Sequence, residues 1–340
     1  MVKRLRAAAG SAKPAVARAR PRPDVRHFFP LGMGGAKGSK GVSPQLEEIA
    51  PDFHLLHAPL EGHIPFAHSI LLTGKRNILI DTGLGPETVQ WLRKRYDVAL
   101  VLNSHYHRDH TWGNAFFKDV PIRAHRLDAH TLNSMKVYFT AMGVIGRKDE
   151  RLIRRETINF IPHLKGPRVG TFEDGEVFDT GSVEVRIVHL PGHSPGHCGF
   201  LEPNSGTIFA ADICCDSFGP WYGHECCSLE DFERSIDRLV ALSPRIYLTA
   251  HTPPIRQNVV RALQNYKSKI EVRNLKLLEL LKEPMSFDRL LATHPLYGHI
   301  PGELKLPFSF WEEVMLGKHL DRLLRARRIE KRGRCYCTVR

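Results

Sequence analysis

The 340-residue sequence has no apolar run that approaches the roughly 18 residues needed for a membrane-spanning helix. Its longest apolar runs, such as Ser69–Leu72 and Ile78–Ile80, have the length of strands. We therefore expect no membrane contact. Hydrophobic residues make up 42% of the chain and charged residues 25%, which excludes a wholly disordered, collagen-like or coiled-coil protein. The length favours about two domains.

The chain does not have the cysteine pattern of a disulfide framework. The seven cysteines are an odd number, and they include the adjacent pairs Cys214-Cys215 and Cys226-Cys227. Neither pair has the C-x-x-C spacing of redox or zinc-binding motifs. We predict free, buried cysteines and a reducing compartment, the cytoplasm.

Basic residues outnumber acidic residues at the two ends of the chain. Residues 1–50 carry a net charge of +7 and residues 255–340 a net charge of +9, whereas residues 51–254 carry −3. Residues 1–42 lack apolar periodicity and contain no acid before Asp24, so we predict a disordered basic arm. An Arg- and Ala-rich start also resembles an organelle transit peptide, which keeps targeting by this arm open as an alternative.

Residues 43–255 alternate short apolar runs with helical patterns, which predicts a layered α/β domain. We predict strands at Ser69–Leu72, Asn77–Ile80, Val98–Leu102, Pro121–Ala124, Val183–Leu190, Thr207–Ala211 and Ile246–Thr249. We predict helices at Glu87–Tyr96, Arg126–Ser134 and Leu229–Leu242. The stretch Met135–Lys165 interrupts this alternation with an amphipathic pattern, and we expect it to form a lid over a site.

Residues 256–340 have a helical pattern that ends in a hairpin turning near Gly333, and we predict a winged-helix-like domain. Its helices are expected at Val259–Leu281, Phe287–Ala292 and Ser309–Arg325. Basic side chains that could pair with nucleic-acid phosphates are Arg322, Arg325, Arg327, Arg328, Lys331, Arg332 and Arg334. The same segment has an apolar stripe of Leu320, Leu323, Leu324 and Ile329, which favours a packing domain that shapes a pocket over a nucleic-acid reader.

Histidine is abundant, with nineteen residues, and its placement is informative. His105, His107, Asp109 and His110 lie within six residues directly after the predicted strand Val98–Leu102. Imidazole and carboxylate groups are ligands that suit zinc, iron or manganese. In a loop at the end of a strand, alternate residues can converge on one point and their neighbours on another.

Four more polar residues follow predicted strands in the same way. They are Asp81, His193, Asp212 and His251. In a layered α/β fold, the carboxyl ends of strands gather the active site. The sequence therefore predicts a metal site built from distant parts of the chain.

The motif order Asp81-Thr82-Gly83, His105-x-His107-x-Asp109-His110, Pro191-Gly192-His193, Asp212 and His251 resembles that of the metallo-β-lactamase fold superfamily. The resemblance covers about residues 50–255 and implies a four-layered αβ/βα sandwich. It also implies a dinuclear site, with the first metal bound by His105, His107 and His193. The second metal would be bound by Asp109, His110 and His251, with Asp212 bridging both and Asp81 orienting a ligand histidine.

Two departures from the family's pattern are visible. Thr252-Pro253 follow the last histidine where the family often has Gly. His197 stands where many members have a small residue, so it is either an extra polar group near the metals or a strand histidine.

The resemblance implies a hydrolase in which two divalent cations share a hydroxide nucleophile. We expect Zn²⁺, with Mn²⁺ or Fe²⁺ as alternatives, and Asp109 or Asp212 as the proton acceptor. Tyr138, His197 and Tyr222 are guesses for the group that protonates the leaving atom, and Trp221-Tyr222 either wall a pocket or simply pack.

The expected substrate is a small ester, thioester or lactone, as in the glyoxalase II type. The helical tail resembles that of a superfamily branch with a lactamase-like endoribonuclease and acyl-thioester hydrolases, so a metal-dependent endoribonuclease using the basic tail is one alternative. A mononuclear-iron persulfide dioxygenase is another. A β-lactamase proper is disfavoured because the chain lacks an apolar signal core. The oligomeric state stays open.

Overall fold

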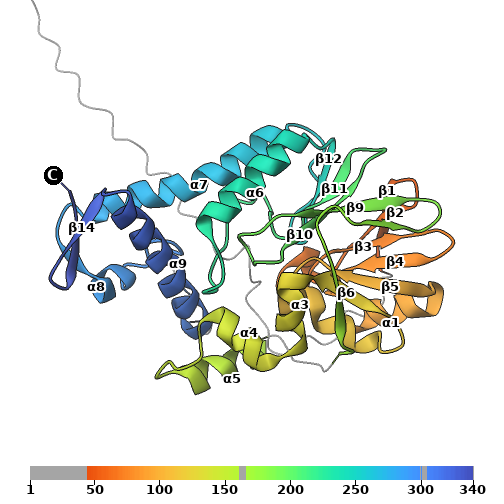
Figure 1. Ribbon diagram of the computed structural model, residues 1–340, viewed down its shortest axis with the longest axis horizontal. Helices are drawn as coiled ribbons and strands as arrows, with labels where there is room; N and C mark the ends of the chain where they lie inside the picture. The colour runs from red at the N-terminus through yellow and green to blue at the C-terminus, as the bar shows by residue number, and fades with distance from the viewer. Residues whose placement is uncertain (1–43, 161–165, 299, 301–304, 340) are drawn as a thin grey trace, which may run out of the picture.

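The computed structural model describes residues 44–160, 166–298, 300 and 305–339. The predicted basic arm, residues 1–42, lies outside the described residues. Two β-sheets are stacked in the larger part of the molecule, helices cover their outer faces, and a smaller helical region extends to one side (Figure 1).

The first sheet has seven strands in sequential order, β1-β2-β3-β4-β5-β6-β7. The bounds are β1 Leu46–Ala50, β2 Phe53–Leu56, β3 Ser69–Leu72, β4 Asn77–Ile80, β5 Val98–Asn103, β6 Ile122–His125 and β7 Val169–Phe172. Strands β1 to β4 pair antiparallel, and β4 to β7 pair parallel. The parallel pairing brings the carboxyl ends of β4 and β5 to one edge of the sheet.

The second sheet has five strands in the order β12-β11-β10-β9-β8. The bounds are β8 Val177–Asp179, β9 Glu184–His189, β10 Cys198–Glu202, β11 Thr207–Phe209 and β12 Ile246–Leu248. Pairing is antiparallel from β8 to β11 and parallel between β11 and β12. The loops after β9, β11 and β12 carry His193, Asp212 and His251.

The core explains why the two sheets stack. Ile80 of β4 and Phe209 of β11 belong to one buried apolar cluster between the sheets. Burying one such side chain stabilises the fold by about 1.5–3 kcal/mol. Helix α1 (Pro86–Arg95) packs on the outer face of the first sheet, and helix α6 (Leu229–Leu242) packs on that of the second. The expected four layers are confirmed.

Helix α6 illustrates how the local sequence specifies an element. The Ser228 side chain accepts a hydrogen bond from the Asp231 backbone N–H and caps the helix. Phe232, Ile236 and Leu239 recur at helical spacing and are buried. Removing the cap with Ser228→Ala should cost about 1 kcal/mol.

Four α-helices lie between β5 and β7 in the sequence. They are α2 (Arg108–Thr111), α3 (Arg126–Asn133), α4 (Met135–Met142) and α5 (Glu150–Phe160), with a 3₁₀ helix at Trp112–Phe116. The predicted lid stretch therefore contains α4 and α5, and its last residues, 161–165, lie outside the described part.

The C-terminal region contains α7 (Val259–Leu280), β13 (Met285–Ser286), α8 (Phe287–Leu291), α9 (Lys305–Arg325), β14 (Ile329–Arg332) and β15 (Cys335–Thr338). The three short strands pair in the order β13-β15-β14. Helix α9 packs on the lid stretch, since Phe310 shares a buried cluster with Tyr138 and Phe139 of α4, and Arg147 forms an ion pair with Glu313. The division into domains at residue 255 and the winged-helix assignment stay predictions.

Every strand and helix that the sequence predicts is present, with its ends shifted by four residues or fewer. Six strands were not predicted: β1, β2, β7, β8, β10 and β13. All seven cysteines are free, and four of them (Cys198, Cys214, Cys227 and Cys337) are buried. Among the described helices, none combines the length and apolarity needed to cross a membrane.

Candidate metal centre

The eight residues predicted for the site come together at the carboxyl ends of strands from both sheets. Asp81 follows β4, and the histidine-rich loop follows β5 and runs into α2. His193 lies four residues after β9 ends, whereas Asp212 and His251 each lie three residues after their strand. Stacking the two sheets brings these loops together.

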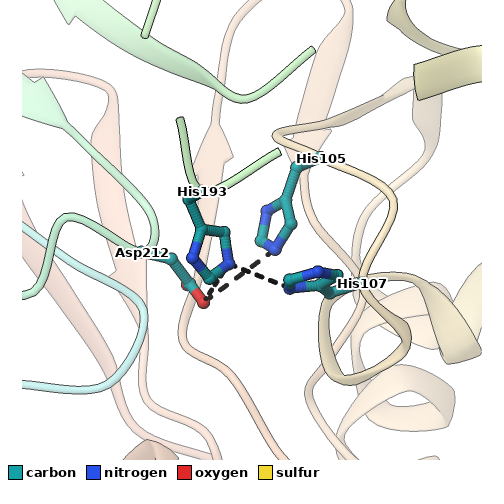
Figure 2. A group of neighbouring side chains, drawn as sticks. All are labelled: His105, His107, His193 and Asp212. Atoms are coloured by element: carbon teal, nitrogen blue, oxygen red, sulfur yellow. Dashed lines mark hydrogen bonds and ion pairs between the residues drawn. The ribbon is translucent and has the colours of Figure 1, made fainter. Parts of the chain in front are cut away.

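The first cluster consists of His105, His107, His193 and Asp212, which point toward one another in Figure 2. The Nε2 atom of His193 lies 2.9 Å from Nδ1 of His107 and 3.1 Å from Oδ2 of Asp212. The Nε2 atom of His105 lies 3.9 Å from the same Asp212 oxygen. All four ligand atoms lie within 4.8 Å of one another.

The second cluster consists of Asp109, His110, His251 and again Asp212. The Nε2 atom of His110 lies 2.9 Å from Oδ1 of Asp212 and 3.3 Å from Nε2 of His251. The Nε2 atom of His251 lies 3.3 Å from Oδ2 of Asp109. Asp212 thus presents Oδ2 to the first cluster and Oδ1 to the second.

Atoms left without hydrogen bonds show that the clusters fit metal ions. His105 Nε2 and Asp212 Oδ1 are fully buried and have no hydrogen-bond partner in the described part of the chain. Asp212 Oδ1 is close to His110 Nε2, but their geometry makes no hydrogen bond. Buried polar atoms are rarely left unsatisfied, and a cation between these lone pairs would satisfy them.

The protonation of the clusters follows from burial and charge. Burial, together with the neighbouring His110, holds the pKa of His105 well below its usual range. Burial also acts to lower the pKa of His251, but Asp212 and Asp109 outweigh it and raise this pKa to about 10. Since a metal ion needs the neutral imidazole, cation binding must displace a proton from His251.

Supporting groups fix the orientation of the imidazoles. The buried Asp81 carboxylate accepts hydrogen bonds from the Ser104 backbone N–H and hydroxyl, and its Oδ2 lies 2.8 Å from His110 Nδ1. The carbonyl oxygens of Trp221 and Gly62 lie 3.0 Å from Nδ1 of His193 and 2.6 Å from Nδ1 of His251. Each contact leaves the Nε2 atom free to bind a cation.

Gly83 allows the histidine-rich loop to approach Asp81. A Cβ atom at this position would lie 1.9 Å from the backbone oxygen of Asp109. Only glycine therefore fits in the Asp81-Thr82-Gly83 turn.

A family profile described as the Metallo-beta-lactamase superfamily matches residues 65–251, a segment that contains all eight predicted site residues. The chain belongs to this superfamily. The prediction of a metal-binding hydrolase of this fold is confirmed.

Relatives of this superfamily chain include two thioesterases. It is 25% identical over 222 residues to the atrochrysone carboxyl ACP thioesterase of Aspergillus fumigatus, covering 63% of this chain and 58% of that protein. It is 25% identical over 186 residues to the acyl-coenzyme A thioesterase MBLAC2 of Gallus gallus, covering 50% and 65%. The chain thus spans less than two thirds of either thioesterase.

A longer match extends beyond the superfamily segment. The lactamase-like protein adaB of Aspergillus niger is 25% identical over 313 residues, covering 83% of this chain and 84% of that protein. The crystal structure of a metallo-beta-lactamase family protein from Thermus thermophilus has a TM-score of 0.66 at 22% identity, covering 86% of this chain and 100% of that one. This structural likeness supports the fold.

His197 lies beside the metal centre of the superfamily chain, but it contacts the backbone. Its Nε2 atom accepts a hydrogen bond from the Asp212 backbone N–H at 3.2 Å, and its Nδ1 atom lies 3.1 Å from the Leu190 carbonyl oxygen. Burial lowers its pKa to about 3, so it is neutral at pH 7. His197 therefore positions the loop that carries Asp212, and it is not a residue of the β10 strand.

His224 is a site residue that the sequence analysis did not identify. Its Nδ1 atom lies 3.2 Å from Nε2 of His107 and 2.6 Å from the Tyr106 hydroxyl oxygen. Burial lowers its pKa to about 3. It lies in a long loop between β11 and α6, so no strand end marked it as a candidate.

Of the three residues guessed as leaving-group acids, Tyr222 is excluded by geometry. Its hydroxyl lies 2.6 Å from Nε2 of His319 and accepts a hydrogen bond from Arg273, and it does not line the metal cavity. Tyr138 lines the cavity, and burial raises its pKa well above the usual range.

The metal clusters open into one cavity with a largely aromatic wall. Trp221 comes from the loop after β11, while Tyr297, Phe308 and Trp311 come from the C-terminal region. The C-terminal region thus forms part of the cavity wall, as the packing interpretation of residues 256–340 expects.

Proposed function

We propose that this chain is a dinuclear metal-dependent hydrolase that cleaves a carbonyl ester bond, with a thioester as the preferred substrate. The observation that carries the proposal is the position of Asp212, whose two oxygens face two separate clusters of histidine and carboxylate groups. One carboxylate shared between two clusters is suited to bridging two cations.

The proposed ligands are His105, His107 and His193 for one cation, and Asp109, His110 and His251 for the other, with Asp212 between them. When bound, two divalent cations, which we propose to be Zn²⁺, lower the pKa of a water molecule towards about 7 and polarise the substrate carbonyl. No serine or cysteine nucleophile is then required.

The protein's own groups orient this chemistry. Asp81 binds Nδ1 of His110, which directs the Nε2 lone pair into the site. Asp109 and Asp212 line the cavity, and we propose that one of their carboxylates accepts the proton of the attacking water. His197 holds the backbone of Asp212 in place.

The cavity wall supports a small organic substrate with an apolar part. Trp221 contacts the rings of His107 and His193, and Phe308 and Trp311 line the same cavity. Aromatic walls of this kind exclude water and bind apolar acyl groups. The two thioesterase relatives support a thioester among the possible carbonyl substrates.

The endoribonuclease alternative has less support. Four of the seven basic residues predicted as phosphate contacts have acidic partners within the chain: Arg322 with Glu233, Arg325 with Glu230, Arg328 with Glu271, and Arg332 with Glu330. A phosphate chain would have to displace these carboxylates. The mononuclear-iron alternative would leave the second cluster of four ligand groups without a role.

A substrate panel tests the proposal. The purified full chain is supplied separately with Zn²⁺, Mn²⁺ and Fe²⁺ and is offered a thioester, a lactone, a phosphodiester and single-stranded RNA. We expect metal-dependent thioester hydrolysis that is lost in Asp212→Ala. Cleavage of RNA without cleavage of any carbonyl substrate would contradict the proposal.

A further inference from the structure

Arg108 has an unusual environment for a charged side chain. It is the first residue of α2, between His107 and Asp109, and it is only 6% exposed. Arg108 lines the metal cavity, and it also lines a neighbouring cavity next to Asn114 and Ser134. Neither terminal nitrogen of the guanidinium, Nη1 or Nη2, has a hydrogen-bond partner among the residues that the structure describes.

Burying an unpaired guanidinium is costly, because an ion loses its hydration and gains no compensating charge. Asp109 and Asp212 line the same cavity, but both contact histidines of the metal clusters and make no ion pair with Arg108. A buried group without a hydrogen-bond partner calls for an explanation, and a ligand that supplies the missing partner is one such explanation.

A second unpartnered donor lines the same cavity. Thr157 of α5 is 7% exposed, and its hydroxyl has no hydrogen-bond partner within the described chain. Threonine in a helix usually bonds to a backbone carbonyl one turn earlier, which this hydroxyl does not do. The cavity is thus lined by a guanidinium and a hydroxyl that have donors available for a ligand, while much of the rest of its wall is aromatic.

We propose that Arg108 binds an anionic oxygen group of the substrate, with the Thr157 hydroxyl as an additional donor. The inference rests on the proposed function, since it concerns the substrate of the same cavity. A guanidinium offers several donors in a fixed plane and pairs with carboxylate or phosphate oxygens. With cations in the neighbouring clusters, the positive charge at Arg108 would be more unfavourable still, so an anion belongs between them.

Two sources could supply the anion in a thioester. It is either a carboxylate on the acyl chain or the phosphate of a phosphopantetheine leaving group. Both offer the same anionic oxygens to Arg108, so substrates must separate them. Two matched pairs do this: hexanoyl and adipoyl thioesters of N-acetylcysteamine, and hexanoyl thioesters of pantetheine and of phosphopantetheine.

The experiment compares kcat/KM within each pair for the zinc-loaded wild type and Arg108→Met. A hydrogen-bonded charge pair predicts that the wild type prefers the anionic member of one pair by about tenfold to a hundredfold. In Arg108→Met the preference should fall to within about twofold, and Arg108→Lys should retain part of it because the charge remains. Thr157→Val should reduce the preference by about threefold.

Arg234→Met is the matched control, because Arg234 is exposed and pairs with Asp231 on the surface of α6. It should keep the wild-type preference. Equal preferences in the wild type and Arg108→Met would overturn the proposal, as would the absence of any anion preference in both pairs.

Binding of the non-hydrolysable thioether analogues, measured by calorimetry, separates this inference from the proposed function. If no thioester is hydrolysed but the anionic analogue binds about tenfold more tightly to the wild type than to Arg108→Met, the proposed function fails and the anion site stands. If hydrolysis occurs but the analogues of each pair bind equally to both proteins, the anion site fails alone.

Discussion

The protein buries two polar clusters that differ in how completely their atoms are bonded. The metal cluster, meaning the first and second clusters of the metal centre taken together, contains buried atoms without hydrogen bonds. The arginine cluster, made of Arg273, Tyr222, His319 and Asn274, is connected throughout. Arg273 donates to the carbonyl oxygens of Phe218 and Pro220 and to the Tyr222 hydroxyl, and His319 contacts both Tyr222 and Asn274.

The same difference separates two buried arginines. Arg273 is 7% exposed and its guanidinium makes three hydrogen bonds, whereas Arg108 is 6% exposed and its two terminal nitrogens make none within the described residues. A satisfied network stabilises the fold, because each atom has replaced its lost water. An unsatisfied one marks the place where a ligand completes the bonding. Burial alone does not distinguish the two.

The largest effect is expected at the bridging carboxylate. Asp212→Ala should lower kcat/KM for the best thioester by at least about a thousandfold, because both cations lose a ligand. The exposed Asp237, which pairs with Lys267, gives the control Asp237→Ala with wild-type activity. Near-normal turnover by Asp212→Ala would show that a carboxylate shared between the two clusters is not needed.

Replacing each of the two arginines by methionine, one at a time, should distinguish an arginine that stabilises the fold from one that binds a ligand. Arg273→Met should lower the free energy of unfolding by about 3–5 kcal/mol, because two buried carbonyl groups and the Tyr222 hydroxyl lose their donor. Arg108→Met should not lower it, because it removes an unpaired buried charge. Urea denaturation of both variants provides the values. A larger loss in Arg108→Met than in Arg273→Met would reverse the comparison.

The arginine cluster should also respond to acid. Burial, with the charges of Arg273 and Arg322, lowers the folded-state pKa of His319 to about 3, below its ordinary value of 6.5. The folded state therefore binds fewer protons than the unfolded one, and the contribution to stability is complete above pH 6.5 and declines as the pH falls toward 3. One such group costs about 1.4 kcal/mol per pH unit.

His319→Gln isolates this contribution, since the variant lacks the titrating imidazole. Between pH 6 and pH 4, its free energy of unfolding should fall less steeply with pH than that of the wild type. The two slopes should differ by about 1.4 kcal/mol per pH unit, which corresponds to one proton. Both proteins are measured at the same zinc concentration, so that the titration of the metal cluster cancels. Parallel pH profiles would mean that His319 is protonated in the folded state.

The smallest effect on stability and turnover is expected from Arg325, one of the basic residues of the C-terminal region. Arg325 pairs with Glu230, and both side chains are well exposed to solvent. Arg325→Ala should change the free energy of unfolding by less than about 1 kcal/mol, and it should leave thioester turnover unchanged. A strong loss of turnover would favour a substrate contact at Arg325.

Much of the site was predictable, because its residues follow apolar strands. Asp81, His193 and His251 each come after a run whose pattern predicts a strand. The order of the motifs resembles that of the superfamily, and this resemblance gave the division of the ligands between two cations. Two of the strands that were not predicted have a weaker strand pattern in the sequence. β7 and β10 each contain a glycine, at Gly170 and Gly199, and glycine weakens a strand pattern.

His224 and Arg108 show what the sequence could not supply. The loop of His224 is held by α4, where the backbone N–H groups of Glu225 and Cys226 donate to the carbonyl oxygens of Met142 and Ala141. Contacts between segments so far apart leave no periodic pattern. Arg108 is visible within the histidine motif, but its lack of a partner depends on everything that packs around it.

The central claim is that the metal centre holds two cations, one in the cluster of His105, His107 and His193 and one in the cluster of Asp109, His110 and His251, with Asp212 shared between them. Elemental analysis of the full chain, purified without chelator, tests this most directly. We predict about two equivalents of transition metal per chain for the wild type and at most about one for Asp212→Ala. A wild-type protein that contains no metal, and takes up none when zinc is added, would contradict the account.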